Sequence, residues 1–541
     1  MQHWPLLVGT ILDHAERQHG TQEVVSRSVE GPIHRTTYAE IARRARQCAA
    51  ALARLGVRPG DRVATLAWNT HRHVEAWYGA AHIGAIYHTV NPRLFESQIA
   101  FIVNDAQDRV ILADLSFVPL LERLQDSCLR GRTIILLTSA GHMPDSPLDL
   151  LCYEDLIAAE ADDLPRLMLP EDAPCGLCYT SGTTGDPKGV LYSHRSNVLQ
   201  ALITHGPDVM ALSAMSVVLP IVPMFHANAW SLAFSAPMVG AKLVLPGNRL
   251  DAESICDLMR KEGVTMAFGV PSVWIDAIPR LRAEGRGTLE RLLVGGAAVP
   301  RAMVEDFAAI GITMAQGWGM TEMSPLGTTT APKPAMAGLS PREQIDQRLK
   351  AGAPFYGVET RIVGADGEVL PCDDVHTGAL QVRGPCVVAE YWRGAGGVVL
   401  DAEGWFDTGD IAAIDRFGYV RIADRAKDVI KSGGEWISSI DLECAAASHP
   451  AIREAAAIAI AHPRWGERPL LVAVRAAGAS LSEAELIAWL GGRVAKWWLP
   501  DRVIFVADLP HTATGKLDKR ALRQQYGADC PPTAEDNRQH C

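Results

Sequence analysis

The chain has 541 residues, of which 48% are hydrophobic and 21% are charged. This composition is typical of a globular protein with a substantial core, and the length predicts roughly three to four compact units, an upper value because α/β domains often run large. The formal net charge of −11 argues against a nucleic-acid-binding surface. The N-terminus lacks a signal-peptide pattern and no apolar run is long enough to cross a bilayer, so we expect a cytoplasmic protein.

The first third of the chain alternates helix and strand patterns. Thr37 and Glu40 have the spacing of a capping box. The apolar residues that follow at alternating spacings of four and three form one helical face: Ile41, Ala45, Cys48, Leu52 and Leu55. Gly56 ends this helix, and residues 62–67 are typical of a buried strand.

The same alternation recurs in residues 76–90 and again in residues 99–113. Repeated helix–strand units at this spacing favour parallel sheets covered by helices. The sequence therefore predicts an α/β fold with a large N-terminal domain of helix-covered sheets.

The sequence pattern changes at about residue 357, where short predicted strands such as Glu359–Val363 and Gly378–Arg383 alternate with glycine turns. This pattern predicts a small β-barrel-like subdomain over about 357–423, which closes an N-terminal domain of residues 1–423. Charged residues followed by paired glycines mark a boundary at 424–428. We expect residues 429–541 to form a small α+β C-terminal domain whose tail, from about 527 to 541, is disordered.

Eleven cysteines are scattered along the chain and give no disulfide framework. Cys175 and Cys178 form a CxxC pair inside an apolar run. Because no second Cys or His pair lies nearby, we interpret them as buried strand residues and not as zinc or redox ligands.

Residues 179–190, YTSGTTGDPKGV, have the composition of a phosphate-binding loop. The spacing differs from a Walker loop, because Lys188 follows a proline and Gly189 stands where that loop needs Ser or Thr. Hydroxyls and a lysine can bind phosphate oxygens, and two glycines let the backbone close around them. The residues concerned are Thr180, Ser181, Gly182, Thr183, Thr184, Gly185 and Lys188.

Three further segments carry polar residues in glycine-rich surroundings. Residues 317–322 read GWGMTE and end in Glu322, a hard oxygen ligand suited to Mg²⁺. Asp410 offers several acceptor lone pairs to a diol, and Lys516 lies in a turn close to the end of the chain. Taken alone, each is more often a solvated carboxylate or a surface lysine.

Together these segments resemble the adenylate-forming superfamily of acyl-CoA synthetases, peptide-synthetase adenylation domains and firefly-type luciferases, over about residues 5 to 525. The resemblance implies that Trp318, where the family usually has Tyr, stacks on adenine, and that Thr180 and Glu322 serve phosphate and magnesium. It implies that Asp410 and Arg425 bind the ribose and that Lys516 is the catalytic lysine of the first half-reaction. It assigns the remaining nucleotide contacts to Gly296, Ala297, Ala298, Gly317, Gly319, Met320 and Thr321.

The family rotates its C-terminal domain between two half-reactions, and Lys427 falls at the position of the hinge residue. The resemblance implies that the segment after the hinge then lines a pantetheine tunnel, through Ser432, Gly433, Gly434, Glu435 and Trp436. A lysine on a separate domain can leave the site before a thiol enters it, which makes such a movement useful.

The acid-binding pocket is expected to be apolar, and the family resemblance is strongest to bacterial medium- and long-chain fatty acyl-CoA synthetases and to 3-methylmercaptopropionate–CoA ligases. Its expected walls are His226, Trp230, Val270, Pro271, Gly295 and Met323. His226 is either the gate of the acyl pocket or a structural loop histidine. Because His226 follows Phe225 where an amino-acid-activating domain has aspartate, the peptide-synthetase interpretation is disfavoured.

The sequence thus predicts an enzyme that uses ATP, Mg²⁺ and coenzyme A to convert an aliphatic acid into its acyl-CoA through acyl-AMP. Its partners are these small molecules, without nucleic acid or integral membrane association, and a homodimer is left open. Two alternatives also remain: an acyl-AMP ligase that loads a separate carrier protein, and a luciferase-like oxygenase. A non-enzymatic binding module is disfavoured because Glu322, Asp410, Arg425 and Lys516 are all present.

Overall fold

A computed structural model of the chain describes residues 1–180, 186–432, 435–511 and 517–527. The chain divides into two compact units. The first consists of Met1–Val299, Met303–Glu359 and Val382–Phe406, and the second of Pro300–Ala302, Thr360–Gln381 and Asp407–Cys541. The length had predicted roughly three to four compact units as an upper value. The structure has two, because the layers of the first unit share continuous hydrophobic cores.

The first unit contains two large sheets, which are mainly parallel. The nine-stranded sheet has the order β16 (Ala353–Pro354), β15 (Leu326–Thr329), β14 (Thr313–Gly319), β13 (Arg291–Gly295), β12 (Met266–Gly269), β10 (Val217–Pro220), β11 (Lys242–Leu245), β1 (Glu23–Arg27) and β2 (Ile33–Thr37). The seven-stranded sheet has the order β7 (Leu150–Cys152), β6 (Thr133–Leu136), β5 (Val110–Ala113), β3 (Arg62–Leu66), β4 (Ile86–Thr89), β8 (Pro174–Tyr179) and β9 (Gly189–Ser193). Antiparallel pairs occur at the ends of both sheets, for example between β8 and β9.

Helices connect these strands. Up to residue 348 the α-helices are α1 (Gly9–His19), α2 (Tyr38–Arg54), α3 (His71–His82), α4 (Glu96–Ala106), α5 (Val118–Leu124), α6 (Tyr153–Ala158), α7 (His194–Thr204), α8 (Leu232–Val239), α9 (Ala252–Glu262), α10 (Pro271–Glu284), α11 (Arg301–Ala309) and α12 (Pro341–Arg348). In the described parts of the chain, every helix is too short or too polar to cross a bilayer.

Both faces of the seven-stranded sheet are covered. Val63 and Ala64 are neighbours on β3 and therefore point to opposite faces. Val63 belongs to a core cluster that also contains Trp77 of α3 and Val218 of β10, whereas Ala64 packs in a cluster with Ile102 of α4. Helices thus lie between the two sheets and also on the outer face of this one.

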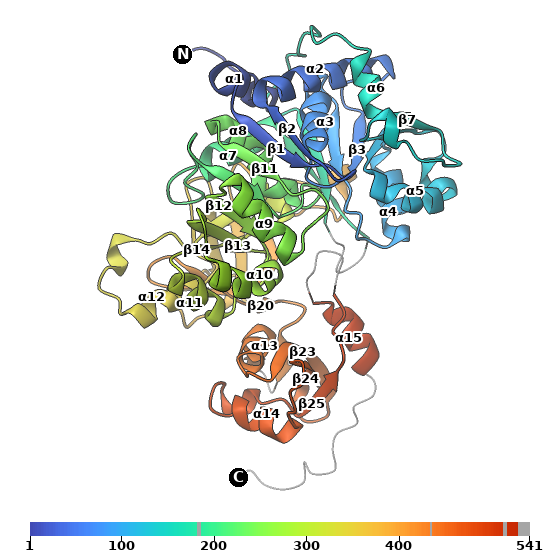
Figure 1. The fold of residues 1–541 in the computed structure, drawn as a ribbon. Coiled ribbons are helices and arrows are strands. Elements are labelled where there is room, and N and C mark those ends of the chain that lie inside the picture. Colours follow the sequence, from blue (N-terminus) through green and yellow to red (C-terminus); the bar gives the residue numbers. More distant parts are fainter. Residues whose placement is uncertain (181–185, 433–434, 512–516, 528–541) are drawn as a thin grey trace. The chain divides into compact units, whose positions relative to one another are not determined.

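The nine-stranded sheet is covered in the same way. Helices α9, α10 and α11 lie along one face (Figure 1), where Leu258, Trp274 and Phe307 share a core cluster with Leu292 of β13. The next residue, Leu293, belongs to the cluster between the sheets. The predicted architecture of parallel sheets covered by helices is therefore confirmed as five alternating layers.

Helix α2 illustrates how the local sequence specifies one element. The Thr37 side chain accepts a hydrogen bond from the backbone N–H of Glu40, as the capping pattern predicts. The predicted apolar face is buried through Ile41 and Leu52. Gly56 follows the helix with a φ of 81°, a left-handed conformation that glycine adopts without strain.

The second unit carries two smaller sheets. The four-stranded sheet, most of whose residues belong to this unit, has the order β17 (Glu359–Val363), β18 (Gly378–Arg383), β19 (Phe406–Ile414) and β20 (Val420–Arg425). The other sheet has the order β22 (Glu435–Ile437), β21 (Ile430–Ser432), β24 (Gly466–Arg475) and β23 (Ile452–His462), and β25 (Arg502–Val506) pairs with β24. Its faces are covered by α13 (Ser439–Ala447) and α14 (Glu483–Leu490) on one side and by α15 (Lys519–Tyr526) on the other.

Two further expectations concern single features. Cys175 and Cys178 are buried, unpaired residues of β8, as the sequence predicts. The tail expected to be disordered lies, from residue 528 on, outside the described residues.

His73, in α3, is fully buried between two oxygen partners. Its Nδ1 lies 2.9 Å from the carbonyl oxygen of Trp68, and its Nε2 lies 2.9 Å from the Thr65 hydroxyl. Burial lowers the pKa of His73 to about 4, from an ordinary value near 6.5. Between these two pH values the unfolded chain binds the proton and the folded chain does not, so His73 costs the protein stability as the pH falls.

We therefore expect His73→Gln to weaken the acid dependence of folding. Between about pH 7 and about pH 5, the wild-type protein should lose about 2 kcal/mol more of its unfolding free energy than the variant does. Urea melts at the two pH values measure this difference, and exposed His142, changed to Gln, is the matched control. Equal pH dependence in the wild-type protein and His73→Gln would show that His73 is protonated in the folded state.

Candidate active site

The predicted phosphate loop joins β8 to β9, and its two ends are held together. The backbone N–H of Thr180 donates to the carbonyl oxygen of Lys188 at 2.9 Å, and the N–H of Lys188 lies 3.3 Å from the Thr180 hydroxyl. These bonds continue the antiparallel pairing of Tyr179 with Gly189. Thr180 and Lys188 therefore face each other at the base of the loop. The other predicted loop residues lie outside the described residues: Ser181, Gly182, Thr183, Thr184 and Gly185.

Glu322 lies on the short turn Thr321–Met323 that follows β14, and its side chain is buried. The hydroxyl of Tyr391 donates to Glu322 Oε1 at 2.8 Å. The backbone of the same turn is fixed by Val388, whose N–H donates to the Glu322 carbonyl, and by Tyr192, whose hydroxyl donates to the Thr321 carbonyl. The carboxylate therefore has a fixed orientation within the first unit.

Tyr391 also contacts the phosphate loop. The Lys188 ammonium lies 5.0 Å from the centre of the Tyr391 ring, a distance at which the ring face attracts a cation. Burial, with the nearby Glu322 carboxylate as a second cause, raises the pKa of Tyr391 well above its ordinary value, so the hydroxyl keeps its proton. One tyrosine thus brings together the predicted phosphate ligand and the predicted metal ligand.

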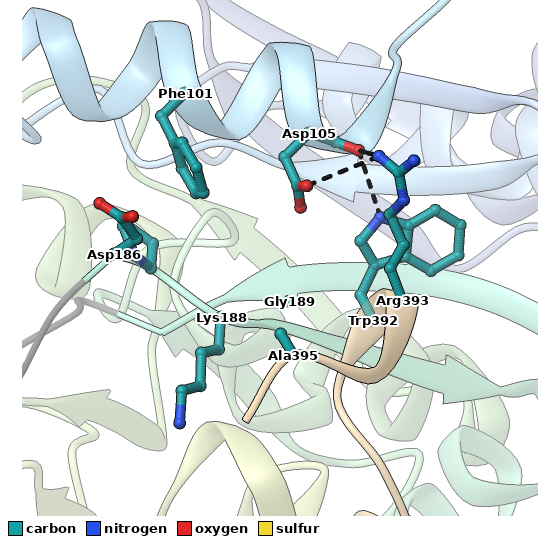
Figure 2. A pocket seen from close by; sticks show the side chains of 9 residues that line it. Phe101, Asp105, Asp186, Lys188, Gly189, Trp392, Arg393 and Ala395 are labelled. Atoms are coloured by element: carbon teal, nitrogen blue, oxygen red, sulfur yellow. Dashed lines mark hydrogen bonds and ion pairs between the residues drawn. The ribbon is translucent and has the colours of Figure 1, made fainter. Parts of the chain in front are cut away.

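A cavity of about 400 Å³ opens beside the end of the phosphate loop, and Lys188 is part of its wall (Figure 2). The other walls come from α4 and from the segment after Tyr391. In Figure 2 the side chains of Trp392 and Arg393 both reach Asp105 of α4. The lining residues are Phe101, Asp105, Asp186, Pro187, Lys188, Gly189, Trp392, Arg393 and Ala395.

The glycines predicted to lie beside the nucleotide occur where strands approach closely. Gly295 at the end of β13 pairs with Gly317 of β14, and a Cβ on Gly295 would lie 2.4 Å from the Gly317 carbonyl oxygen. The same Cβ would lie 3.4 Å from the Trp230 ring, and one on Gly296 would lie 3.3 Å from Val270. The structure therefore brings Gly295, Gly296, Gly317, Trp230 and Val270 together.

The other predicted nucleotide and pocket residues of the first unit lie around this cluster. Pro271 is buried at the start of α10, and Met323 is buried in a cluster with Tyr192 and Tyr391. Half-buried Trp318 pairs with Thr328 across β14 and β15. Gly319 is the last residue of β14, and the remaining members lie after β13 or after β14: Ala297, Ala298, Met320 and Thr321.

An unexpected feature includes the predicted pocket residue Trp230. Residues Ala227–Ser231 all have positive φ, from 44° to 67°, although none is glycine. A left-handed conformation costs an ordinary residue about 1–2 kcal/mol, so the surrounding core has to impose it; all five residues are buried. Half-buried His226 lies directly before this turn. Strain of this kind concentrates at functional sites.

The second unit holds a different group of predicted residues. Asp410 on β19 is buried, and its carboxylate forms an ion pair of 2.7 Å with Arg425, its partner across the sheet on β20. Exposed Lys427 follows this strand, and Ser432 ends β21. Glu435 and Trp436 pair with β21 through their backbones. Gly433, Gly434 and Lys516 lie outside the described residues.

Sequence reasoning missed Tyr391 and Asp105. Tyr391 meets its partner Glu322 across 69 positions of the chain, and no local spacing predicts such a contact. Asp105 lies on an amphipathic helix, where a carboxylate is ordinarily solvated. The left-handed turn contains Asn228, a residue type that favours positive φ, but no local pattern indicates that its four neighbours Ala227, Ala229, Trp230 and Ser231 share this conformation.

Several known proteins are similar to this chain in sequence and in structure. A family model described as AMP-binding enzyme matches residues 12–392, and one described as AMP-binding enzyme C-terminal domain matches residues 441–516. The chain is 44% identical over 530 residues to a medium-chain-fatty-acid–CoA ligase of Ectopseudomonas oleovorans, with 96% of each chain covered. It is 45% identical over 529 residues to a 3-methylmercaptopropionyl-CoA ligase of Ruegeria lacuscaerulensis, covering 96% of this chain and 97% of that one. The solved structure of ATP-bound MatB from Rhodopseudomonas palustris is similar with a TM-score of 0.82 and 25% identity, covering 96% of this chain and 99% of that one.

The close approach of β13 and β14 predicts that Gly295→Ala destabilises the protein. The added methyl group would lie 2.4 Å from a backbone oxygen that cannot rotate away, so we expect a loss of about 2 kcal/mol in unfolding free energy. Chemical denaturation measures it. Gly141→Ala is the matched control, because Gly141 is exposed and, among the described residues, no heavy atom lies within 4 Å of the place its added methyl group would take. A Gly295→Ala variant as stable as that control would contradict the packing described.

Proposed function

The chain belongs to the AMP-binding enzyme family, and we propose that it is an ATP-dependent acid–thiol ligase. It would activate an aliphatic carboxylic acid as acyl-AMP and transfer the acyl group to coenzyme A. One observation carries the proposal: the chain matches, over nearly its whole length, two CoA ligases at 44% and 45% identity. Their names specify a medium-chain fatty acid and 3-methylmercaptopropionate, so we propose acids of these two kinds as the substrate class.

The apolar surroundings of Gly295 support an aliphatic substrate. Trp230 lies beside Gly295, and Val270 lies beside Gly296. Neither side chain carries a charge, so an acid with a second charged group would find no ion-pair partner in them to offset its lost hydration. Because each methylene group contributes only modest discrimination, several chain lengths should be accepted.

In the first half-reaction the acid carboxylate would attack the α-phosphate of ATP and displace pyrophosphate. Two anions meet in this step, so fixed positive charge lowers the barrier. We assign Lys188 to the phosphates and Lys516 to the reacting oxygens. Asp410 would accept hydrogen bonds from the ribose hydroxyls, and its ion pair with Arg425 supports this role by orienting the carboxylate.

The first unit offers a fitting but small set of magnesium ligands. The Glu322 carboxylate and the Thr180 hydroxyl are oxygen donors of the kind Mg²⁺ prefers, and Tyr391 orients the carboxylate. No group of three metal-ligating side chains exists among the described residues, which suits an ion that takes most of its ligands from nucleotide phosphates and water. When bound, the ion would neutralise phosphate charge.

We also propose that the two half-reactions use different arrangements of the chain. Residues 1–423 would hold the nucleotide and acid, residues 424–428 would act as a hinge, and residues 429–541 would move. Lys516 would leave after adenylation, and residues 432–436 would then line the path of the CoA thiol. A hinge absorbs its backbone rotation at a few residues, here at Lys427.

Product analysis with a panel of acids tests the proposed function. We expect AMP and pyrophosphate to accumulate over many turnovers only when an aliphatic acid and coenzyme A are both present. The panel runs from propionate and 3-methylmercaptopropionate to palmitate, with reactions lacking acid or CoA as controls. AMP formation that stops after one turnover despite CoA would point to another acceptor, such as a carrier protein. ADP as the product would contradict the proposal.

Separate assays of the half-reactions test the role of the second unit. Lys516→Ala should abolish adenylation and spare thioester formation from supplied acyl-AMP, because the lysine is needed only while two anions meet. Lys427→Pro should have the opposite effect, since it restricts the hinge. Exposed Lys261, changed to Ala, controls for loss of a lysine. If a variant loses equal rate in both half-reactions, the role assigned to its lysine is contradicted.

A further inference from the structure

The segment Tyr391–Trp392–Arg393, here called the 391–393 segment, is not part of any motif that the sequence analysis used. Its backbone is joined to β9, where Tyr391 forms an antiparallel bridge with Val190. Val190 lies two positions after Lys188, so the segment runs beside the exit of the phosphate loop. The backbones of Gly189 and Trp392 lie close together, because a Cβ on Gly189 would lie 2.9 Å from the Trp392 Cβ.

Tyr391 is placed between the two chemically different parts of the site. Its hydroxyl donates to Glu322 at 2.8 Å, and its ring face lies 5.0 Å from the Lys188 ammonium. Phenylalanine would fill the same buried space and attract the same cation. The hydroxyl is therefore the part of Tyr391 that packing does not explain. It donates a hydrogen bond to Glu322, the predicted metal ligand.

Asp105 of α4 contacts both Tyr179, which precedes the phosphate loop, and the 391–393 segment, which runs beside the end of the loop. Its carboxylate accepts a hydrogen bond of 2.6 Å from Tyr179, the last residue of β8 before the loop. Its carbonyl oxygen accepts hydrogen bonds of 3.3 Å from the Trp392 indole and from the Arg393 guanidinium (Figure 2). Arg393 also lies 3.7 Å from the Asp105 carboxylate. One residue thus connects the strand that enters the loop to the segment that carries Tyr391.

We propose that Tyr391 is a positioning residue for the Glu322 carboxylate, and that Asp105 anchors the 391–393 segment so that Glu322 is held at a fixed place relative to the phosphate loop. The inference rests on the proposed function, since it gives Glu322 the role of magnesium ligand. Groups that orient a ligating carboxylate typically influence metal affinity by about tenfold or more. The direct consequence is an effect on magnesium dependence, not on folding or on acid binding.

The test is a magnesium titration of ATP–pyrophosphate exchange in the full-length protein, together with a titration of Mn²⁺ binding to the protein and ATP followed by electron paramagnetic resonance, in which the same shift is expected. Tyr391→Phe should raise the half-saturating Mg²⁺ concentration about tenfold, and excess Mg²⁺ should restore the wild-type rate because the carboxylate itself remains. Tyr38→Phe is the matched control, since it also removes a buried hydroxyl that donates to an oxygen, at 2.6 Å from the Ala241 carbonyl. That control should titrate like the wild-type protein.

Asp105→Asn provides a second, independent variant. It removes the side-chain charge beside Arg393 but leaves the backbone carbonyl that binds Trp392 and Arg393, so it should raise the magnesium requirement by a smaller factor than Tyr391→Phe. It should add little in the Tyr391→Phe background, because both changes act on the position of the Glu322 carboxylate. Asp126→Asn, which weakens an exposed ion pair with Arg130, controls for loss of an acidic charge.

The outcomes separate this inference from the proposed function. If the wild-type protein shows no ATP–pyrophosphate exchange with any acid of the panel, the proposed function is overturned, and the inference with it. Exchange in the wild-type protein, with Tyr391→Phe and Asp105→Asn titrating like their controls, would overturn the inference alone. A lower maximal rate at unchanged magnesium requirement would also overturn it, because that result indicates a general structural role.

Discussion

The hydrogen bond from Tyr391 to Glu322 joins segments of the first unit that are distant in the chain. It fixes the carboxylate after β14 against the segment that runs beside β9. The ring of the same tyrosine faces Lys188, whose backbone closes the phosphate loop against Thr180. Because each contact involves residues on or beside the strands of the sheets, we infer that the rigidity of these contacts comes from the sheets.

This rigidity suits the electrostatics of the proposed reaction. The chain carries a net charge of −11, yet it has to bind a nucleotide and a carboxylate, which are both anions. Overall charge therefore cannot supply the attraction, and a few positioned groups must do so. We assign this role to Lys188, to Arg425 with Asp410, and to Lys516. We propose that uncharged Trp230 and Val270 form part of the pocket wall, so that the substrate carboxylate is the reactive anion.

The sequence predicted the features that depend on local pattern. The Thr37 cap, the buried face of α2 and the strands Glu359–Val363 and Gly378–Arg383 all occur as expected, because capping and periodicity are properties of neighbouring residues. Gly295 and Gly317 were picked out as members of two separate motifs, but their close approach across β13 and β14 was not predicted. Long-range contacts were not predictable in this way, as the pairing of Tyr391 with Glu322 and of Asp105 with Tyr179 shows. The left-handed turn at Ala227–Ser231 opposes local propensity, so only tertiary packing can explain it.

The central claim is that the acid carboxylate becomes bonded to the α-phosphate of ATP. Its most direct test is to supply an aliphatic acid labelled with heavy oxygen in both carboxylate positions, together with ATP and CoA, and to analyse the released nucleotide by mass spectrometry. We predict that AMP carries one heavy oxygen atom, because the bridging oxygen of acyl-AMP stays on phosphorus when the thiol attacks the acyl carbon. Unlabelled AMP, with the label in inorganic phosphate or retained in the acid, would contradict an acyl-adenylate intermediate.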